Sequence, residues 1–231
     1  MPTIHKLIVL ILFKIIALGC FAQQNITTHS KVNLKYTIID TVKVRPNSAL
    51  LKVLWLNDTI TLWKQNIEVK IDIGRYRKAL KDSTALSNPK DIEELIKLRK
   101  MSGQNCYSYA LEKYFENNTV YSQSIFGKRT SLSRETIETI LDEYFEKVGE
   151  FRTKPKRNLN QPVADDVVLA FENKFKWIIH TVYHKEGVFY TKNGWNKPGK
   201  FKSLRKFLKK SYWDTERIIV YKIDSEKVSK D

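Results

Sequence analysis

The sequence predicts an α+β protein, because strong helical and strand patterns follow one another in its later part. The clearest helix runs from Ser133 to Val148, where apolar residues recur on one face, Ser133 can cap the start and Gly149 can end it. Residues 165–194 instead form short β-branched and aromatic runs around a turn, which is typical of paired antiparallel strands. A small β-rich region, residues 23–86, precedes these elements.

Composition limits the class of protein. The 231 residues are 42% hydrophobic and 12% aromatic, which is enough for a packed core. The net charge of +16 suits anionic partners, whether nucleic acid, acidic lipid or anionic wall polymers, and does not choose among them. With only Cys20 and Cys106, the chain has neither a disulfide framework nor a cysteine-rich zinc site.

Residues 1–22 have the pattern of an export signal. The apolar run from Leu7 to Leu18 is shorter than a membrane-spanning helix, and small residues follow it. We expect cleavage after Ala22, with lipidation at Cys20 or an uncleaved anchor as alternatives. All three predict an exported protein that is periplasmic, secreted or a membrane-anchored lipoprotein.

The remaining chain divides into the β-rich region, residues 23–86, and a main domain, residues 87–231. In the first region we expect a strand from Val32 to Ile38, a hairpin of Leu50–Leu56 and Thr59–Trp63 around Asn57-Asp58, a strand over Asn66–Ile73 and a short helix over Arg75–Asp82. In the second we expect a helix from Ser87, one opened by Cys106, the helix Ser133–Val148, the strands Asp166–Phe171, Trp177–His184 and Val188–Asn193, a basic helix Ser203–Tyr212 and a last strand Arg217–Ile223.

Cys106 is the first candidate for chemistry. Gly103 interrupts the chain before it, and Ala110, Leu111 and Tyr114 then recur at helical spacing. A thiol at a helix N-terminus lies near free backbone N–H groups and the positive end of the helix dipole, which both favour the reactive thiolate. The alternative is that Cys106 is a small buried apolar residue.

The histidines do not predict a metal site. His180 and His184 are four residues apart, but on a strand that spacing separates them by about 13 Å. We therefore expect no metal and no cofactor. His180 lies in an apolar run, so it is either a core histidine with a satisfied hydrogen bond or a residue of a cleft.

The turn after this strand decides which residue faces His180. A two-residue turn at Glu186-Gly187 places Asn193 opposite His180 and Thr191 opposite Val182. A three-residue loop would instead place Lys192 opposite His180, where its charge would lower the pKa of the imidazole.

Several of these stretches resemble the NlpC-type family of papain-like cysteine peptidases and amidases. They are a Cys opening a helix, the strand beginning Asp166-Val167-Val168, the run His180-Thr181-Val182-Tyr183, and Phe189-Tyr190-Thr191-Lys192-Asn193-Gly194 after a turn. The resemblance covers about residues 91–223 and implies a Cys-bearing helix packed on an antiparallel sheet. It implies Cys106 as nucleophile, His180 as base, and Asn193 or Thr191 as the residue that orients the base. Backbone N–H groups at the helix start, with Gln104, would hold the oxyanion.

By this resemblance the chain is an exported cysteine peptidase or amidase that hydrolyses amide bonds, with peptidoglycan stem peptides as substrate. One alternative is a catalytically inactive envelope-binding module on the same fold, since Thr191 stands where many relatives carry a strand histidine. Another is a lipid acyl hydrolase or transferase, although Cys106 preceding His180 favours the peptidase order. Lys206, Lys209 and Lys210 could hold the protein at an anionic membrane or wall surface, and no nucleic acid is expected as a partner.

Overall fold

The structure of the chain is a computed structural model that describes residues 30–45, 48–65, 103–194 and 197–229. The expected export signal, the strand Asn66–Ile73, the helix Arg75–Asp82 and the helix starting at Ser87 lie outside these residues. From Val32 onward, the described residues form one compact unit. Among the described helices, none has the length and apolar character needed to cross a membrane.

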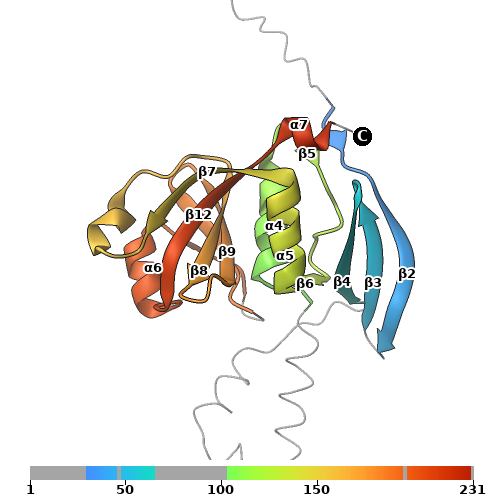
Figure 1. Cartoon of the computed structure of the whole chain (residues 1–231), viewed down its shortest axis with the longest axis horizontal. Helices are drawn as coiled ribbons and strands as arrows, with labels where there is room; N and C mark the ends of the chain where they lie inside the picture. Colours follow the sequence, from blue (N-terminus) through green and yellow to red (C-terminus); the bar gives the residue numbers. More distant parts are fainter. Residues whose placement is uncertain (1–29, 46–47, 66–102, 195–196, 230–231) are drawn as a thin grey trace, which may run out of the picture. The chain divides into compact units, whose positions relative to one another are not determined.

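The largest element is a six-stranded sheet in which every neighbouring pair is antiparallel (Figure 1). Its strands, in spatial order, are β11 (Gly199–Phe201), β10 (Val188–Thr191), β9 (Ile178–Lys185), β8 (Val167–Asn173), β12 (Thr215–Ile223) and β7 (Phe145–Arg152). The apolar runs that predicted strands after residue 165 are thus confirmed.

A second, four-stranded antiparallel sheet carries the β-rich region. It is made of β2 (Tyr36–Arg45), β3 (Ser48–Trp55), β4 (Asp58–Gln65) and β6 (Thr130–Leu132), while β1 (Val32–Asn33) pairs in parallel with β5 (Tyr121–Ser122). The expected boundary at residues 86 and 87 lies outside the described residues. The described parts on its two sides share this sheet, because β4 pairs with β6.

Two helices, α4 (Cys106–Asn117) and α5 (Arg134–Tyr144), lie between the two sheets (Figure 1). Their apolar faces join Trp55 and Leu62 of the four-stranded sheet and Ala170 and Tyr183 of the six-stranded sheet in one core. The α+β class is therefore confirmed, with a cysteine-bearing helix packed against an antiparallel sheet.

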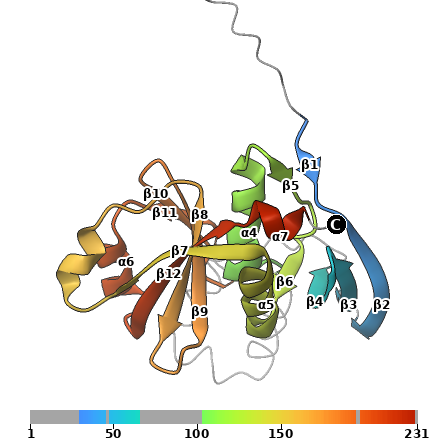
Figure 2. The same ribbon diagram turned by 45° about the horizontal axis from the view of Figure 1, so that its top comes forward.

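The other face of the six-stranded sheet has its own core under α6 (Leu204–Lys210) and the short 3-10 helix η2 (Lys156–Asn160) (Figure 2). Leu204 and Leu208 of α6 pack there with Phe171, Val182 and Phe189 of the strands. A last short helix, α7 (Ser225–Val228), follows β12. The sheet consequently has two buried faces, one toward α4 and one toward α6.

The predicted helix Ser133–Val148 begins where expected but ends four residues early. The Ser133 hydroxyl accepts a hydrogen bond from the N–H of Thr136 and caps α5, whereas Phe145 already has extended backbone angles. Pairing of Phe145–Arg152 with β12 satisfies the backbone of this segment, and Val148 becomes an exposed strand residue. The end predicted at Gly149 was wrong because a long-range strand partner overrides helical spacing.

The hairpin of β3 and β4 is confirmed, but its turn is Leu56-Asn57 and not Asn57-Asp58. Trp55 pairs with Asp58, and Leu56 adopts a positive φ of 53°. The hydroxyl of Tyr144 fixes this turn, because it accepts from the N–H of Asn57 at 3.1 Å and donates to Asp58 Oδ2 at 2.7 Å. The partner that selects the turn thus comes from α5, far away in the sequence.

Candidate active site

Cys106 is the first residue of α4, as the sequence predicts. Asn105 caps the helix: its Oδ1 accepts from the N–H of Ser108 at 3.3 Å, and its Nδ2 donates to the carbonyl of Leu132 at 2.7 Å. The cap therefore binds the start of α4 to β6 and fixes the position from which the thiol projects.

The thiol of Cys106 is buried, with the residue 8% exposed. Burial raises the pKa of the thiol to about 11, although hydrogen bonding to the backbone N–H groups of Thr181, Tyr107 and Cys106 and the charge of Lys192 act to lower it. The sequence predicted a stabilised thiolate from the helix N-terminus alone. That expectation is corrected, since desolvation outweighs the helix terminus and the resting group is a neutral thiol.

The backbone of β9 reaches the thiol because β10 is shorter than β9. Glu186 and Gly187 form a two-residue turn with positive φ angles of 50° and 70°, and Val188 pairs with Lys185. The two-residue register is thereby confirmed as far as Tyr190 and Tyr183, where the pairing ends. In an antiparallel ladder, every second residue points its N–H toward the neighbouring strand. Lys185 and Tyr183 do so toward β10, and the N–H of Thr181 points the same way, beyond the last pair. The thiol of Cys106 occupies this place.

His180 lies on the opposite face of the sheet from α4. Its ring is fully buried and stacks on Tyr212, with ring centroids 4.0 Å apart, and it also contacts the rings of Phe171 and Phe207. Burial lowers the pKa of His180 to about 3, so the imidazole is neutral. Thr181, the next residue, faces α4 and donates its hydroxyl to the carbonyl of Cys106 at 3.1 Å.

The thiol and the imidazole are therefore neighbours of one peptide group, the one that joins His180 to Thr181. Its N–H acts on the thiol and lowers the pKa of Cys106, and the side chain of His180 leaves from its other end. Tyr212 also connects the two groups, since burial and then the charge of an ionised Cys106 raise the pKa of this tyrosine while its ring stacks on His180.

A short polar chain favours one tautomer of His180. Its Nε2 lies 2.7 Å from Thr191 Oγ1, and the Thr191 hydroxyl donates to Asn193 Oδ1 at 3.4 Å. Asn193 Oδ1 also accepts from the hydroxyl of Tyr212 at 3.3 Å. Because the Thr191 proton is given to Asn193, the Thr191 oxygen accepts the Nε2 proton of His180. Nδ1 then carries the lone pair, and among the described residues it has no hydrogen-bond partner.

Of the two residues expected beside His180, Thr191 thus makes the direct contact and Asn193 lies one step further along the chain of hydrogen bonds.

Lys192 is a site residue that the sequence did not assign to the cysteine. Its side chain is 9% exposed, and Nζ donates to the carbonyls of Gln104 and Gly194 at 2.5 Å each. Burial lowers the pKa of Lys192 to about 8, while the charge of Cys106 acts to raise it. Strand alternation could have predicted this position, because neighbouring residues of a strand face opposite sides. With Thr191 toward His180, Lys192 faces α4.

The side chain of Gln104 has other partners than a carbonyl at Cys106. Its Nε2 donates to Glu112 Oε2 at 2.8 Å and to the carbonyl of Phe126 at 3.3 Å. Both amide hydrogens are engaged, so a part in an oxyanion hole would require Gln104 to exchange these partners. Its backbone carbonyl instead positions Lys192.

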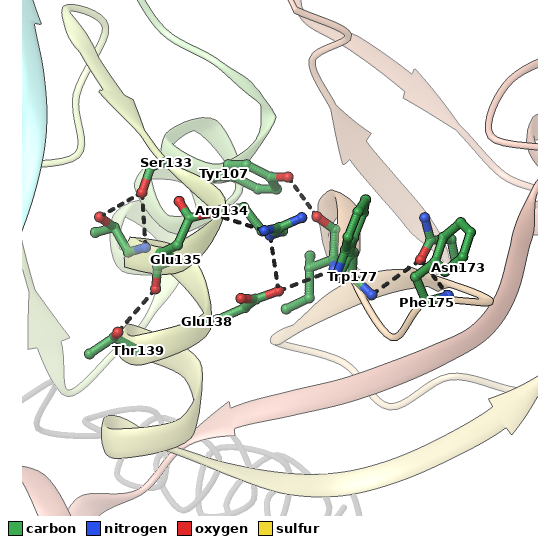
Figure 3. A network of polar contacts seen from close by, with 11 residues as sticks. Tyr107, Ser133, Arg134, Glu135, Glu138, Thr139, Asn173, Phe175 and Trp177 are labelled. Atoms are coloured by element: carbon green, nitrogen blue, oxygen red, sulfur yellow. Dashed lines mark hydrogen bonds and ion pairs between the residues drawn. The ribbon is translucent and has the colours of Figure 1, made fainter.

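Ile178, at the start of β9, is hydrogen-bonded to both helices (Figure 3). The hydroxyl of Tyr107 donates to the carbonyl of Ile178 at 2.7 Å, and Glu138 of α5 accepts from the N–H of Ile178 at 3.3 Å. Arg134 lies over the ring of Trp177, 4.5 Å from its centroid. These contacts hold the start of β9 against the first turns of α4 and α5, and they fix where Thr181 meets the thiol.

His184 is separate from this arrangement. Its Nδ1 lies 2.8 Å from the carbonyl of Ala164, and its ring packs on Phe189. Within the ranges that the structure describes, no three His, Cys, Asp or Glu residues form a group that could hold a metal ion.

Comparison of the chain with models of protein families, with curated proteins and with solved structures gives no match. The site contains a thiol beside three backbone donors and a cation. On the other face of the sheet, one residue before Thr181, it contains a neutral imidazole whose Nδ1 has no hydrogen-bond partner among the described residues.

Proposed function

We propose that the protein is a papain-like cysteine peptidase or amidase, with Cys106 as nucleophile and His180 as base. The observation that carries this proposal is the buried Nδ1 of His180, which has no partner among the described residues while Thr191 holds the other ring nitrogen. A buried polar atom without a partner costs about 1–3 kcal/mol. A catalytic role is a reason for a protein to keep such an atom, because Nδ1 must be unpaired at rest to accept a proton during the reaction.

The proposed reaction is acyl transfer. The Cys106 side chain first has to turn toward Nδ1 of His180, since the two groups lie on opposite faces of the sheet and are not hydrogen-bonded at rest. Nδ1 then takes the proton of the thiol while the sulfur bonds to the carbonyl carbon of an amide. The N–H groups of Cys106 and Tyr107, in the first turn of α4, bind the oxygen that becomes negative. His180 then gives the proton to the leaving amine, and water activated by the same imidazole hydrolyses the thioester to a carboxylic acid and free thiol.

Both reacting groups are neutral at rest, so the proposed proton transfer occurs only during attack on a bound substrate. The pKa of the thiol is raised by burial and that of the imidazole is lowered by burial, which opposes a stable thiolate–imidazolium pair. Lys192 offsets part of this cost, because its ammonium group favours negative charge on the sulfur. Substrate binding would have to expose the sulfur. Without substrate, we therefore expect Cys106 to react slowly with general thiol reagents.

The proposed substrates are amides of the bacterial cell envelope, with peptidoglycan stem peptides first among them. This part of the proposal rests on the resemblance of the sequence to NlpC-type enzymes and on the export pattern of residues 1–22. The protein would then act in the periplasm, outside the cell or attached to a membrane by a lipid.

A second candidate function is an envelope-binding module without catalysis. The burial and neutrality of both Cys106 and His180 favour it, since a thiol that never becomes exposed would serve only as core packing.

One experiment separates the two candidates. The mature protein and its Cys106→Ala variant are incubated with p-nitrophenyl acetate and, separately, with peptidoglycan fragments that carry stem peptides. If the protein is an enzyme, we expect mass spectrometry to show an acetyl group on Cys106 and new amino and carboxyl ends in the peptides. Neither should appear with the variant. Binding of the fragments by both proteins without acetylation or cleavage would overturn the catalytic proposal and leave the binding module.

A further inference from the structure

A hollow of about 640 Å³ lies beside α6, on the far side of the second core from the strands. It is lined by the segment that follows β7, by η2, by α6 and by the residues that lead into β12. The volume is that of a site for a small ligand or a short piece of a polymer. The hollow shares no residue with the site around Cys106.

The lining is strongly basic. Five of its residues carry a positive charge, and none carries a negative one: Lys154, Lys156, Arg205, Lys206 and Lys209. In the described part of the chain, none of the five takes part in an ion pair. Five cations that converge on one concave surface repel one another, and an anionic ligand would relieve this repulsion.

An aromatic side chain completes the lining. Trp213 is 82% exposed, the most exposed large hydrophobic residue of the described chain. The cause is local, because Tyr212 turns inward with a positive φ of 57° to stack on His180, and the next side chain is then directed outward. An indole held at the edge of a hollow offers a flat apolar face together with an N–H donor.

We propose that this hollow binds an anionic glycan, a sugar chain that carries phosphate or carboxylate groups. The five cations would hold the negative groups, and the Trp213 ring would cover the apolar face of one sugar ring. The proposal goes beyond the activity at Cys106, since it concerns where the protein is held and not the bond that it cleaves.

The geometry favours a glycan over two other polyanions. Proteins that bind single-stranded nucleic acid stack successive bases on several aromatic residues along a groove, whereas this hollow has one exposed aromatic ring and is bounded. An anionic lipid surface is contacted best by a flat or protruding basic face, whereas these cations surround a concavity.

The test is equilibrium binding of the mature protein to dextran phosphate, neutral dextran and inorganic polyphosphate at low salt. We expect dextran phosphate to bind most tightly. Lys206→Glu/Lys209→Glu should weaken binding of both polyanions about tenfold or more, because it reverses two charges of the lining. Lys35→Glu/Lys43→Glu, which changes two exposed lysines elsewhere by the same charge, should leave both affinities unchanged.

Trp213→Ala is the decisive variant. It should weaken dextran phosphate about tenfold and leave polyphosphate unchanged, because only the glycan offers a ring to the indole. Phosphatidylglycerol vesicles and oligodeoxythymidine are measured in the same way. Four outcomes overturn the proposal: unchanged affinity of Trp213→Ala for dextran phosphate, equal affinity of the wild type for both polyanions, tighter binding to the vesicles than to dextran phosphate, or tighter binding to oligodeoxythymidine. Circular dichroism of each variant shows whether it is folded, and Trp213→Phe, which keeps a ring, should restore most of the affinity.

Discussion

The two faces of the six-stranded sheet hold their functional groups by different means. On the α4 face, backbone N–H groups and one buried lysine surround the thiol of Cys106. On the α6 face, the rings of Phe171, Phe207 and Tyr212 enclose His180, and a single hydroxyl orients it. The thiol is thus positioned by main chain and charge, and the imidazole by aromatic packing.

This difference explains why both groups are neutral at rest. Aromatic rings remove water from His180 and offer no carboxylate to stabilise an imidazolium, so its pKa falls. The α4 face does offer stabilisation to a thiolate, but burial of the sulfur exceeds it. The two faces meet at the peptide between His180 and Thr181, because β10 ends early and leaves the N–H of Thr181 facing the sulfur.

The largest expected effect separates the two histidines of β9, which share a face. His180→Gln should slow acetylation of Cys106 by p-nitrophenyl acetate about 10²–10⁴-fold, because it removes the proton acceptor. His184→Gln changes a buried histidine whose Nδ1 is bonded to a backbone carbonyl, so its rate should stay near that of the wild type. Equal rates in the two variants would show that the α6 face takes no part in the reaction.

The next effect belongs to the α4 face. Lys192→Met keeps the length of the side chain but removes the charge that lowers the pKa of Cys106, so acetylation should slow about 10–100-fold. The pKa of the thiol, followed by its alkylation rate against pH, should rise above about 11. Lys192→Arg keeps the charge and should recover part of the rate. A normal rate in Lys192→Met would remove this lysine from the account.

A smaller effect is expected from the residue that orients the base. Thr191→Val retains the shape but loses the oxygen bonded to Nε2 of His180, and acetylation should slow about tenfold. Thr191→Ser keeps a hydroxyl and should restore the rate, which distinguishes orientation of the ring from simple packing. If the serine variant is as slow as the valine variant, the hydroxyl is not what matters.

The last effect is on stability and comes from protonation of His180. Its pKa is near 3 in the folded protein and about 6.5 when unfolded, so the unfolded chain binds the extra proton first. Above pH 6.5, His180 is neutral in both states and protonation does not reduce the stability of the fold. As the pH falls from 6.5 toward 3, the unfolded chain binds a proton that the folded protein does not, and the free energy of unfolding falls. The free energy of unfolding, measured with urea between pH 6 and 4, should therefore fall more steeply in the wild type than in His180→Gln, by about 1 kcal/mol per pH unit. His184→Gln serves as the control.

Much of the fold could be predicted because local pattern and final environment agree. The runs of β8 and β9 are apolar and β-branched, and both strands are buried on two faces. The register of β9 and β10 followed from the turn alone, since Glu186 and Gly187 both take the positive φ of a two-residue hairpin turn. Ser133 capped α5 for the same local reason.

What could not be predicted depends on partners that are distant in the sequence. The strand β7 exists because β12 pairs with it, and the helical spacing around Val148 gives no sign of that partner. The thiol of Cys106 looked like a stabilised thiolate because the helix start is local, whereas its burial depends on β9, which lies about seventy residues later. The role of Lys192 needed the same long-range contact, with Gln104.

The most direct test of the account is the state of the His180 ring, read from its ¹⁵N chemical shifts in the folded protein between pH 5 and 8. We expect one neutral tautomer throughout, with the proton on Nε2 and an unprotonated Nδ1, and a change in the Nδ1 chemical shift on acetylation of Cys106. A proton on Nδ1, or an imidazolium at neutral pH, would contradict the claim that a neutral His180 waits to accept the proton of Cys106.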